Sequence, residues 1–268
     1  MNSLTTVEWK LARADDHLNV LGDLIEAFVR PPAGQVEPYG AFTEEDQETG
    51  ETVLRGTVAA DPPLGEIGVI IGDALHNLRS GLDHLAWKLG GDPPPNPGQS
   101  EFPIFLDRDA FRGSQRGRSG YTKIEGLDDH AQAIIEDIQP FNGGQERHPL
   151  WLLHELSRQD KHRLPLLTGA VVEGAVHAKA SGDNAVEIGL VDLGGALNVG
   201  PFEDRQVIGR WSPGHFSPEP KSHEDLGLFF DVAFSPEGPA PGMPVMDTLL
   251  TIREFIDGEV LPRLAPFG

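Results

Sequence analysis

The sequence predicts an α+β protein in which a helical bundle of about five helices carries an N-terminal β-hairpin and an inserted antiparallel β subdomain. Three observations support this fold class. Apolar residues recur at three- and four-residue steps in several long stretches, as they do along one face of a helix. Short alternating runs between Gly, Pro, Asn and Asp residues are typical of strands. The two kinds of segment are grouped along the chain instead of alternating regularly, which is typical of α+β proteins.

A long amphipathic helix is expected over residues 4–28, where apolar side chains recur at helical spacing. Pro31 ends it, because a proline has no backbone N–H to continue the hydrogen-bond ladder. Residues 36–42 and 52–59 then read as strands on either side of a polar stretch. This arrangement predicts a β-hairpin.

Residues 66–89 are expected to form the central helix, around which the other elements are organised. No proline interrupts this stretch, and Gly90 closes it. Ile and Leu recur there at three- and four-residue steps, so one broad face of the helix is apolar and is expected in the core. The apolar positions are Ile67, Ile71, Leu75, Leu78, Leu82, Leu85 and Leu89.

After the central helix, a proline-rich linker at 92–98 leads to a short apolar segment, 101–106, which is expected to pack on the helical core. The basic stretch 108–123 is expected to be a solvated loop, as charge blocks usually are. Two further helices are predicted at 129–138 and 149–163, because both show helical spacing and prolines mark their ends.

From residue 166 the sequence changes to short apolar or alternating runs, which indicate β structure. The strands expected there are 171–172, 185–190, 206–211 and 226–234. A proline-glycine linker then precedes a last amphipathic helix at 245–260.

These elements predict the organisation of the chain into domains. Residues 1–165 would form the helical bundle and would carry the hairpin at about 36–59. Residues 166–236 would form the β subdomain. A C-terminal helix within 244–264 would return to the bundle.

The composition excludes several classes of function. The chain has no cysteine, which excludes disulfides, thiolate metal sites and thiol catalysis. Its net charge of -21, from 42 acidic and 21 basic residues, disfavours binding of phosphate backbones over the whole surface. No apolar run is long enough to cross a bilayer, and the N-terminus shows an amphipathic pattern instead of a signal peptide. We therefore expect no membrane association and a cytoplasmic location.

The side of the central helix opposite its apolar face carries residue types suited to chemistry, where Lys and Glu would be usual. Placed at 100° per residue, they gather on that side and along its edge. These residues are Asp73, His76, Asn77, Arg79, Ser80, Asp83, His84 and Trp87.

Within this group Arg79 and His84 form an R-x4-H spacing, with the polar Ser80 directly after the Arg. In this feature the sequence resembles the HEPN superfamily, helical-bundle proteins of which many are metal-independent endoribonucleases. In that family two such helices meet across a dimer and line one composite cleft. The resemblance implies that the protein binds RNA and forms a homodimer, and that it needs no cofactor.

The resemblance also implies a role for each residue. His84 would handle the proton of the attacking 2′-hydroxyl or of the leaving oxygen, and Arg79 would stabilise charge on the phosphoryl group. On a straight helix these two residues point about 140° apart, so they would converge only through long side chains or a second protomer. The residues expected to support them are His76, Asn77, Ser80 and Asp83.

A second group of chemical side chains lies on the predicted helix 149–163. His154, Arg158, Lys161 and His162 share one face of this helix, with Trp151 beside them. In a functional interpretation these cations help to bind a phosphate next to His84. In a structural interpretation Arg158 and Lys161 pair with Asp73 or Asp83 of the central helix and fix the register of the bundle.

A metal site is a further alternative, since carboxylate and histidine ligands from two bundle helices can hold a metal ion. We expect none, because the paired Glu-x-x-His motifs of di-iron bundles are absent. If a metal were bound, its ligands would come from Asp73, His76, His84, His154, Glu155 and His162.

The function that the sequence favours is therefore RNA binding or metal-independent RNA cleavage, with Arg79 and His84 at the centre. The alternative is a non-catalytic protein-interaction module. In that alternative the polar residues form a structural network between bundle helices, and the acidic surface meets a protein partner.

Overall fold

The computed structural model describes residues 4–113, 119–165, 167–174, 203–211 and 228–268. It divides the chain into two compact units. We call Met1–Gly22, Gly65–Pro165 and Met246–Gly268 the helical unit, and Asp23–Leu64 with Leu166–Val245 the sheet unit. The predicted α+β class, with a helical bundle and an N-terminal hairpin, is confirmed.

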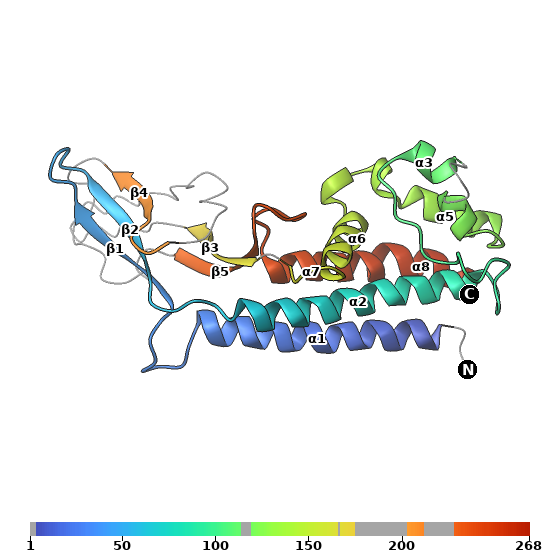
Figure 1. Cartoon of the computed structure of the whole chain (residues 1–268), viewed down its shortest axis with the longest axis horizontal. Coiled ribbons are helices and arrows are strands. Elements are labelled where there is room, and N and C mark those ends of the chain that lie inside the picture. The colour runs from blue at the N-terminus through green and yellow to red at the C-terminus, as the bar shows by residue number, and fades with distance from the viewer. Residues whose placement is uncertain (1–3, 114–118, 166, 175–202, 212–227) are drawn as a thin grey trace, which may run out of the picture. The chain divides into compact units, whose positions relative to one another are not determined.

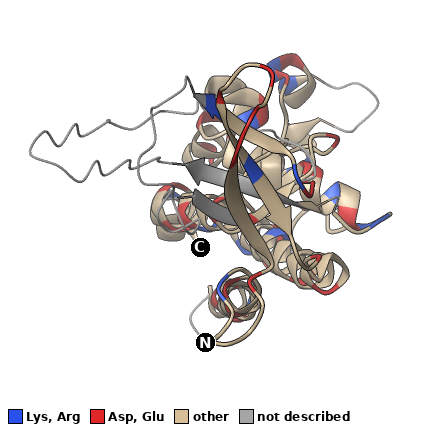
Figure 2. Cartoon of the chain, turned by 90° about the vertical axis from the view of Figure 1, so that its left-hand side faces the viewer, with Lys and Arg blue, Asp and Glu red and all other residues tan. Residues whose placement is uncertain are grey.

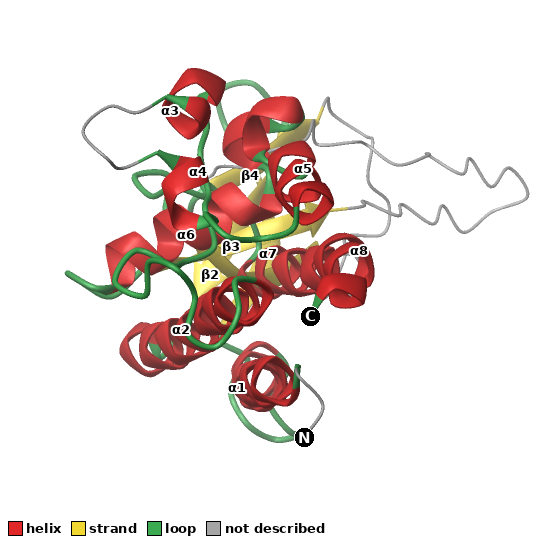
Figure 3. Cartoon of the chain, turned by 90° about the vertical axis from the view of Figure 1, so that its right-hand side faces the viewer, coloured by secondary structure: helices red, strands yellow, loops and turns green. Residues whose placement is uncertain are grey.

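The core of the helical unit is built on α2 (Leu64–Leu89), which lies beside the first part of α1 (Thr5–Val29) (Figure 1 and Figure 3). The predicted apolar face of α2 is buried, and Ile67, Ile71 and Leu75 have no exposed surface. A Cβ atom at Gly81 would lie only 3.1 Å from Cδ2 of Leu11, so this glycine permits a close approach of the two helices.

The last predicted helix is present as α7 (Val245–Phe255), which continues through a π-helical turn, η4 (Ile256–Val260), into α8 (Leu261–Leu264). Arg253 joins α7 to α1 because its Nε and Nη2 atoms bind the two oxygens of Asp15, at 2.7 and 3.0 Å. Such a two-pronged Arg–carboxylate pair fixes both position and orientation. The C-terminal helix therefore lies in the helical unit.

The basic stretch predicted as a solvated loop instead contains two short helices, α3 (Arg108–Arg112) and α4 (Gly120–Lys123). Side-chain caps start both helices: Asp107 accepts a hydrogen bond from the N–H of Ala110, and Ser119 accepts one from the N–H of Thr122. Phe111 of α3 is fully buried, so this stretch belongs to the core as well as to the surface.

The other predicted helices of this unit are present close to their expected bounds. They are α5 (Asp129–Asp137) and α6 (Pro149–Asp160). Two short 3-10 turns, η1 (Pro140–Asn142) and η2 (Gln145–Arg147), connect them, and a third, η5 (Ala265–Phe267), follows α8.

The sheet unit holds the hairpin, in which β1 (Tyr39–Glu45) and β2 (Thr52–Val58) pair antiparallel from Tyr39↔Val58 to Glu45↔Thr52. β4 (Val207–Trp211) pairs with the other edge of β2, so the strand order is β1-β2-β4. A second, two-stranded sheet pairs β3 (Leu167–Gly174) with β5 (Leu228–Phe234).

The strands expected at 206–211 and 226–234 correspond to β4 and β5, and β3 is longer than the expected 171–172. The strand expected at 185–190 lies outside the described residues. The hairpin was expected to belong with residues 1–165. In the structure the hairpin shares a sheet with β4, and it belongs to the sheet unit. In the described part of the chain, no helix has the length and apolar character needed to cross a membrane.

Candidate functional site

Arg79 of α2 is mostly buried, with 16% of its side chain exposed, and it binds a backbone group outside its own helix. Its Nη2 atom donates a hydrogen bond to the carbonyl oxygen of Phe102 at 2.7 Å and lies 3.1 Å from Oδ1 of Asp83. The same carboxylate oxygen accepts a hydrogen bond from the N–H of Phe102 at 3.0 Å. Arg79 and Asp83, one helical turn apart, therefore hold both polar backbone groups of Phe102.

The segment 101–106 packs on the core as expected, since Phe102 has no exposed surface. Its backbone is satisfied by side chains instead of a neighbouring strand. Gln139, which is fully buried, accepts a hydrogen bond from the N–H of Phe105 at 3.0 Å and donates one to the carbonyl oxygen of Pro103 at 2.9 Å. Side chains from α2 and from the end of α5 thus fix this segment, and with it the surroundings of Arg79.

The second terminal nitrogen of Arg79, Nη1, is buried and has no hydrogen-bond acceptor among the described residues. Two other basic side chains are close enough to this guanidinium for its charge to change their pKa. The charge of Arg79 lowers the pKa of Lys123 and of His154, in each case as the next cause after burial. We call Arg79, Lys123 and His154 the basic cluster.

Lys123 reaches the basic cluster from the end of α4. Its Nζ atom pairs with the carboxylate of Glu101 and lies 5.7 Å from the centre of the Phe105 ring. Burial and the charge of Arg79 lower the pKa of Lys123, and the carboxylate of Asp83 opposes them. The lysine thus has its own partner but shares the surroundings of Arg79.

His154 of α6 is the histidine of the basic cluster, and 37% of its side chain is exposed. Burial and the charge of Arg79 lower its pKa from the ordinary value of 6.5, while Glu155 acts in the opposite direction. The imidazole is therefore neutral at neutral pH, the form that can accept a proton. Its ring stacks on Trp151, with 5.5 Å between the ring centres and 23° between the planes.

His84, the other half of the R-x4-H spacing, lies in a different environment. Burial and the charges of Lys10 and Lys88 lower its pKa, Asp83 acts in the opposite direction, and Arg79 is not among the causes. Lys10 belongs to α1, and a Cβ atom at Gly81 would lie 3.7 Å from its Cβ. Within one chain the structure does not bring Arg79 and His84 to a common point, because their separation along the helix turns them toward different neighbours.

The residues of α2 that were expected to support Arg79 and His84 do not gather around either of them as one group. Asn77 is buried and donates a hydrogen bond from its side chain to the carbonyl oxygen of Asp73 in its own helix, at 2.8 Å. His76 is exposed, and Ser80 is half-buried. Asp83 is the one supporting residue bound directly to Arg79.

The four basic residues expected on one face of α6 also lie in different environments. Arg158 pairs with Glu155 in the same helix, with Nε 3.1 and 3.2 Å from the two carboxylate oxygens, instead of with Asp73 or Asp83. Lys161 and His162 follow the end of α6 and are exposed. Of the four candidates on this segment, His154 is therefore the one that lies in the field of Arg79.

Asp160, which was not selected from the sequence, lies at the end of α6 against α2. A Cβ atom at Gly72 would lie 2.8 Å from Cγ of Asp160, so the absence of a side chain at Gly72 leaves room for this carboxylate. Burial and the charge of Asp73 raise the pKa of Asp160, and His76 acts in the opposite direction. In the described ranges, no group of three or more His, Asp or Glu side chains is arranged to hold a metal ion.

Sequence reasoning missed Lys123, whose pKa the charge of Arg79 lowers, and Glu101, which pairs with Lys123. The cap at Ser119, followed by the short run to Lys123, was the one local signal that could have placed this lysine on a helix. No local signal points to Glu101, because its position depends on how the segment 101–106 folds back on α2.

Comparison with known proteins provides no relative on which to model the site. No protein-family model, no curated protein and no solved structure matches this chain. The function must therefore be inferred from the chemistry of the basic cluster.

Proposed function

We propose that the protein binds RNA at the basic cluster and cleaves it without a metal ion. One observation carries the proposal: a buried guanidinium nitrogen, Nη1 of Arg79, has no acceptor among the described residues and lies in a field shared with Lys123 and His154. An unpaired donor in such surroundings costs free energy, and an anionic oxygen that displaced the side chains covering it would satisfy it. The planar guanidinium is well suited to phosphate.

In the proposed reaction His154 removes the proton from a ribose 2′-hydroxyl, because its lowered pKa keeps the imidazole neutral at neutral pH. The 2′-oxygen attacks the adjacent phosphorus, and the bond from phosphorus to the 5′-oxygen breaks. Water gives a proton to the leaving 5′-oxygen, and the hydroxide that remains takes the proton from His154, so the products are a 2′,3′-cyclic phosphate and a 5′-hydroxyl. Arg79 and Lys123 stabilise the negative charge that grows on the phosphoryl oxygens.

The net charge of -21 limits the kind of RNA binding that this protein can have. A surface of this charge repels a polyanion, so the attraction must come from a small number of local contacts. We therefore expect weak binding. The affinity should depend only shallowly on salt concentration, with the slope for about two to three neutralised phosphates. The resemblance to HEPN proteins adds a homodimer to the proposal, and the absence of cysteine and of an apolar run long enough to cross a bilayer adds a cytoplasmic location.

The proposal is tested by incubating the purified protein with mixed RNA, with and without EDTA. Arg79→Gln and His154→Gln are expected to lower the cleavage rate about 100-fold or more, as the loss of a charge-stabilising donor or a general base does. His130→Gln is the matched control, because His130 is an exposed histidine of α5. Loss of cleavage in EDTA, or full activity of His154→Gln, would contradict the proposal.

His84→Gln separates this site from the R-x4-H pair inferred from the sequence. If the basic cluster of one chain suffices, His154→Gln must abolish cleavage whatever the effect of His84→Gln. Loss of activity in His84→Gln alone would return the reaction to the pair of Arg79 and His84, completed by a second protomer.

A protein-interaction module is the second candidate, and the hydrogen bonds of Arg79 and Asp83 to the backbone of Phe102 favour it. Arg79 and Asp83 already stabilise the fold, since they bind the carbonyl oxygen and the N–H of Phe102. In this alternative the polar residues fix the bundle and the acidic surface meets a protein partner. Absence of cleavage by the wild-type protein, together with a large loss of stability in Arg79→Gln, would support it.

A further inference from the structure

Trp151 lies on α6 one turn before His154, at the edge of the basic cluster. The two rings are nearly parallel, with an interplanar angle of 23° and 5.5 Å between their centres. Trp151 is partly exposed, and 37% of the His154 side chain is exposed. The imidazole covers one face of the indole, so a further ring can stack only on the opposite face of Trp151, next to the basic cluster.

The indole is not part of the α6 core. Leu150, Leu153 and Leu156 occupy the buried face of this helix and have no exposed surface, whereas Trp151 lies at its border. Trp87 differs from it, because its indole N–H reaches Asp92 at 3.5 Å. Trp9 lies on α1 and is 60% exposed. Among the described residues, Trp151 is therefore the tryptophan stacked on a member of the basic cluster.

An aromatic plane beside Arg and Lys is the combination that binds a nucleotide with an unpaired base. The base stacks on the aromatic ring while the cations hold the adjacent phosphate. A base inside an A-form duplex is stacked on its neighbours and offers no free face, so a duplex cannot use such a platform.

We infer that Trp151 is the base-stacking residue of this site, and that the ligand is RNA with an unpaired base beside the bound phosphate. This inference rests on the proposed function, since it assumes that the basic cluster holds a phosphate. It makes Trp151 a specificity-determining residue: Arg79 and Lys123 bind any phosphate backbone, and Trp151 requires a free base next to it.

The test compares two uncleavable probes of equal length and charge, a 2′-O-methyl oligoadenylate and an abasic 2′-O-methyl ribose-phosphate oligomer. Trp151→Leu is expected to weaken binding of the oligoadenylate about 5- to 150-fold, the range for the loss of one stacked base, and to leave binding of the abasic oligomer unchanged. Trp9→Leu is the matched control, because it removes a more exposed indole from α1. The affinity of Trp9→Leu for both probes should equal that of the wild type.

Arg79→Gln distinguishes failure of the inference from failure of the proposed function. It should weaken binding of both probes, because it removes the phosphate contact that both share. Normal binding of both probes by Arg79→Gln would overturn the proposed function. If Arg79→Gln weakens both but Trp151→Leu weakens neither, or weakens both equally, the inference about the base is overturned and phosphate binding stands.

A second measurement needs no substitution of Trp151 in the protein that is titrated. In protein labelled with 5-fluorotryptophan, the 19F resonance of Trp151 is assigned by its absence from Trp151→Phe. This resonance should shift on addition of the oligoadenylate and remain in place on addition of the abasic oligomer. Equal shifts with the two probes would contradict base stacking.

Discussion

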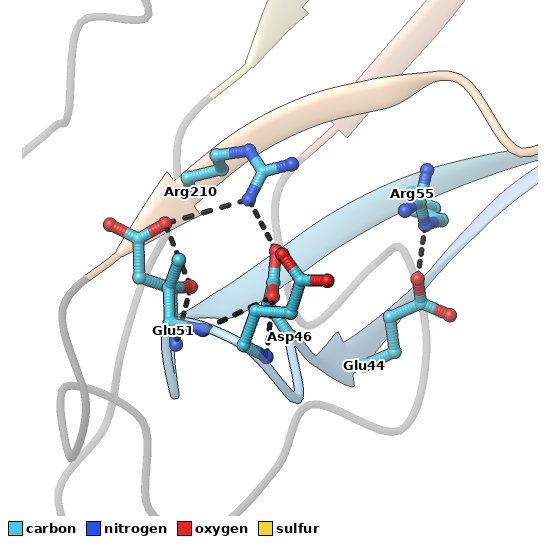
Figure 4. A network of polar contacts seen from close by, with 7 residues as sticks. Glu44, Asp46, Glu51, Arg55 and Arg210 are labelled. Atoms are coloured by element: carbon cyan, nitrogen blue, oxygen red, sulfur yellow. Dashed lines mark hydrogen bonds and ion pairs between the residues drawn. The ribbon is translucent and has the colours of Figure 1, made fainter.

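This molecule has two charged clusters, one in each unit, and their arginines differ in the partners that they bind. In the sheet unit, acidic and basic residues occur together along the hairpin (Figure 2) and bind one another (Figure 4). Arg210 of β4 lies 2.9 Å from Oδ2 of Asp46 and 3.5 Å from Oε2 of Glu51, and Arg55 pairs with Glu44. In the helical unit, Arg79 has a partly buried carboxylate and a backbone carbonyl, and its Nη1 atom has no acceptor among the described residues.

The pKa shifts show the same contrast. The hydrogen bond from Arg210 and those from the N–H groups of Glu48 and Thr49 lower the pKa of Asp46, and the hydrogen bond to Asp46 raises the pKa of Arg210, so these two groups favour each other's charged forms. In the basic cluster the charge of Arg79 lowers the pKa of Lys123 and His154, so these groups disfavour one another's charged forms. The ion pairs of the hairpin cluster stabilise a turn. In the basic cluster Arg79 and Lys123 have acidic partners of their own, Asp83 and Glu101, but Nη1 of Arg79 has no acceptor among the described residues and favours an added anion.

The largest expected effect on stability comes from Asp83→Ala. This change leaves the guanidinium of Arg79 without its carboxylate and the N–H of Phe102 without an acceptor. Because a third of the Asp83 side chain is exposed, we expect a loss of about 2 to 3 kcal/mol in the free energy of unfolding, less than for a fully buried pair. Urea unfolding followed by circular dichroism measures it.

Arg210→Ala is the matched change in the hairpin cluster. Its side chain is 45% exposed, and its partners Asp46 and Glu51 remain in contact with water. We expect a loss much smaller than that of Asp83→Ala, and one that disappears in high salt because exposed charges are screened. Equal losses from the two changes would remove the distinction between the clusters.

Stability in the sheet unit is expected to depend on burial as well as on ion pairs. The pH dependence that the buried hydroxyl of Tyr39 causes is a test of this expectation. Burial raises the pKa of Tyr39 to about 12, and the charge of Asp61 adds to the effect. Above the ordinary pKa of about 10, the unfolded chain releases this proton and the folded chain keeps it, so stability falls as the pH rises. For Tyr39 alone the loss reaches about 2 kcal/mol by pH 12.

Tyr39→Phe supplies the control for this pH dependence. The variant lacks the titrating hydroxyl, so its stability should fall less steeply than that of the wild type between pH 10 and pH 12. The difference between the two urea-unfolding curves isolates Tyr39 from the lysines that titrate in the same range. Parallel pH dependences would show that the phenol is not held neutral by the fold.

The smallest expected effect is a shift in the pKa of His154 when a neighbouring cation is removed. Lys123→Met should raise this pKa, because the charge of Lys123 lowers it. Arg79→Gln should raise it further, since Arg79 contributes more. NMR titration of the His154 ring resonances measures both shifts. Lys161→Met, which removes an exposed lysine beyond the end of α6, should leave the pKa unchanged.

Much of the fold could be predicted from local sequence, because local signals determine these elements. The absence of proline and the spacing of Ile and Leu identified α2 and its buried face, and a polar turn between two apolar runs identified the hairpin. α3 and α4 were missed because their caps, Asp107 and Ser119, lie in a stretch dominated by charge.

The candidate site could be predicted only in part, because it depends on contacts between distant segments. Arg79 and His154 were both selected from helical spacing, but their common environment requires α2, α4 and α6 to meet. Spacing also placed Asn77 on the open face of α2, where the structure buries it. A helix covered on more than one side has no single polar face, so a periodic pattern alone misplaces residues at the border of that face.

In the proposed complex, a phosphate bound by Arg79 lies beside His154. The most direct measurement is the pKa of His154, by NMR, with and without a 2′-O-methyl oligoribonucleotide that binds but is not cleaved. A phosphate near the imidazole stabilises its protonated form, so binding should raise the pKa of His154 in the wild type and leave it unchanged in Arg79→Gln. A saturating oligonucleotide that leaves the pKa of His154 unchanged in the wild type would contradict the claim.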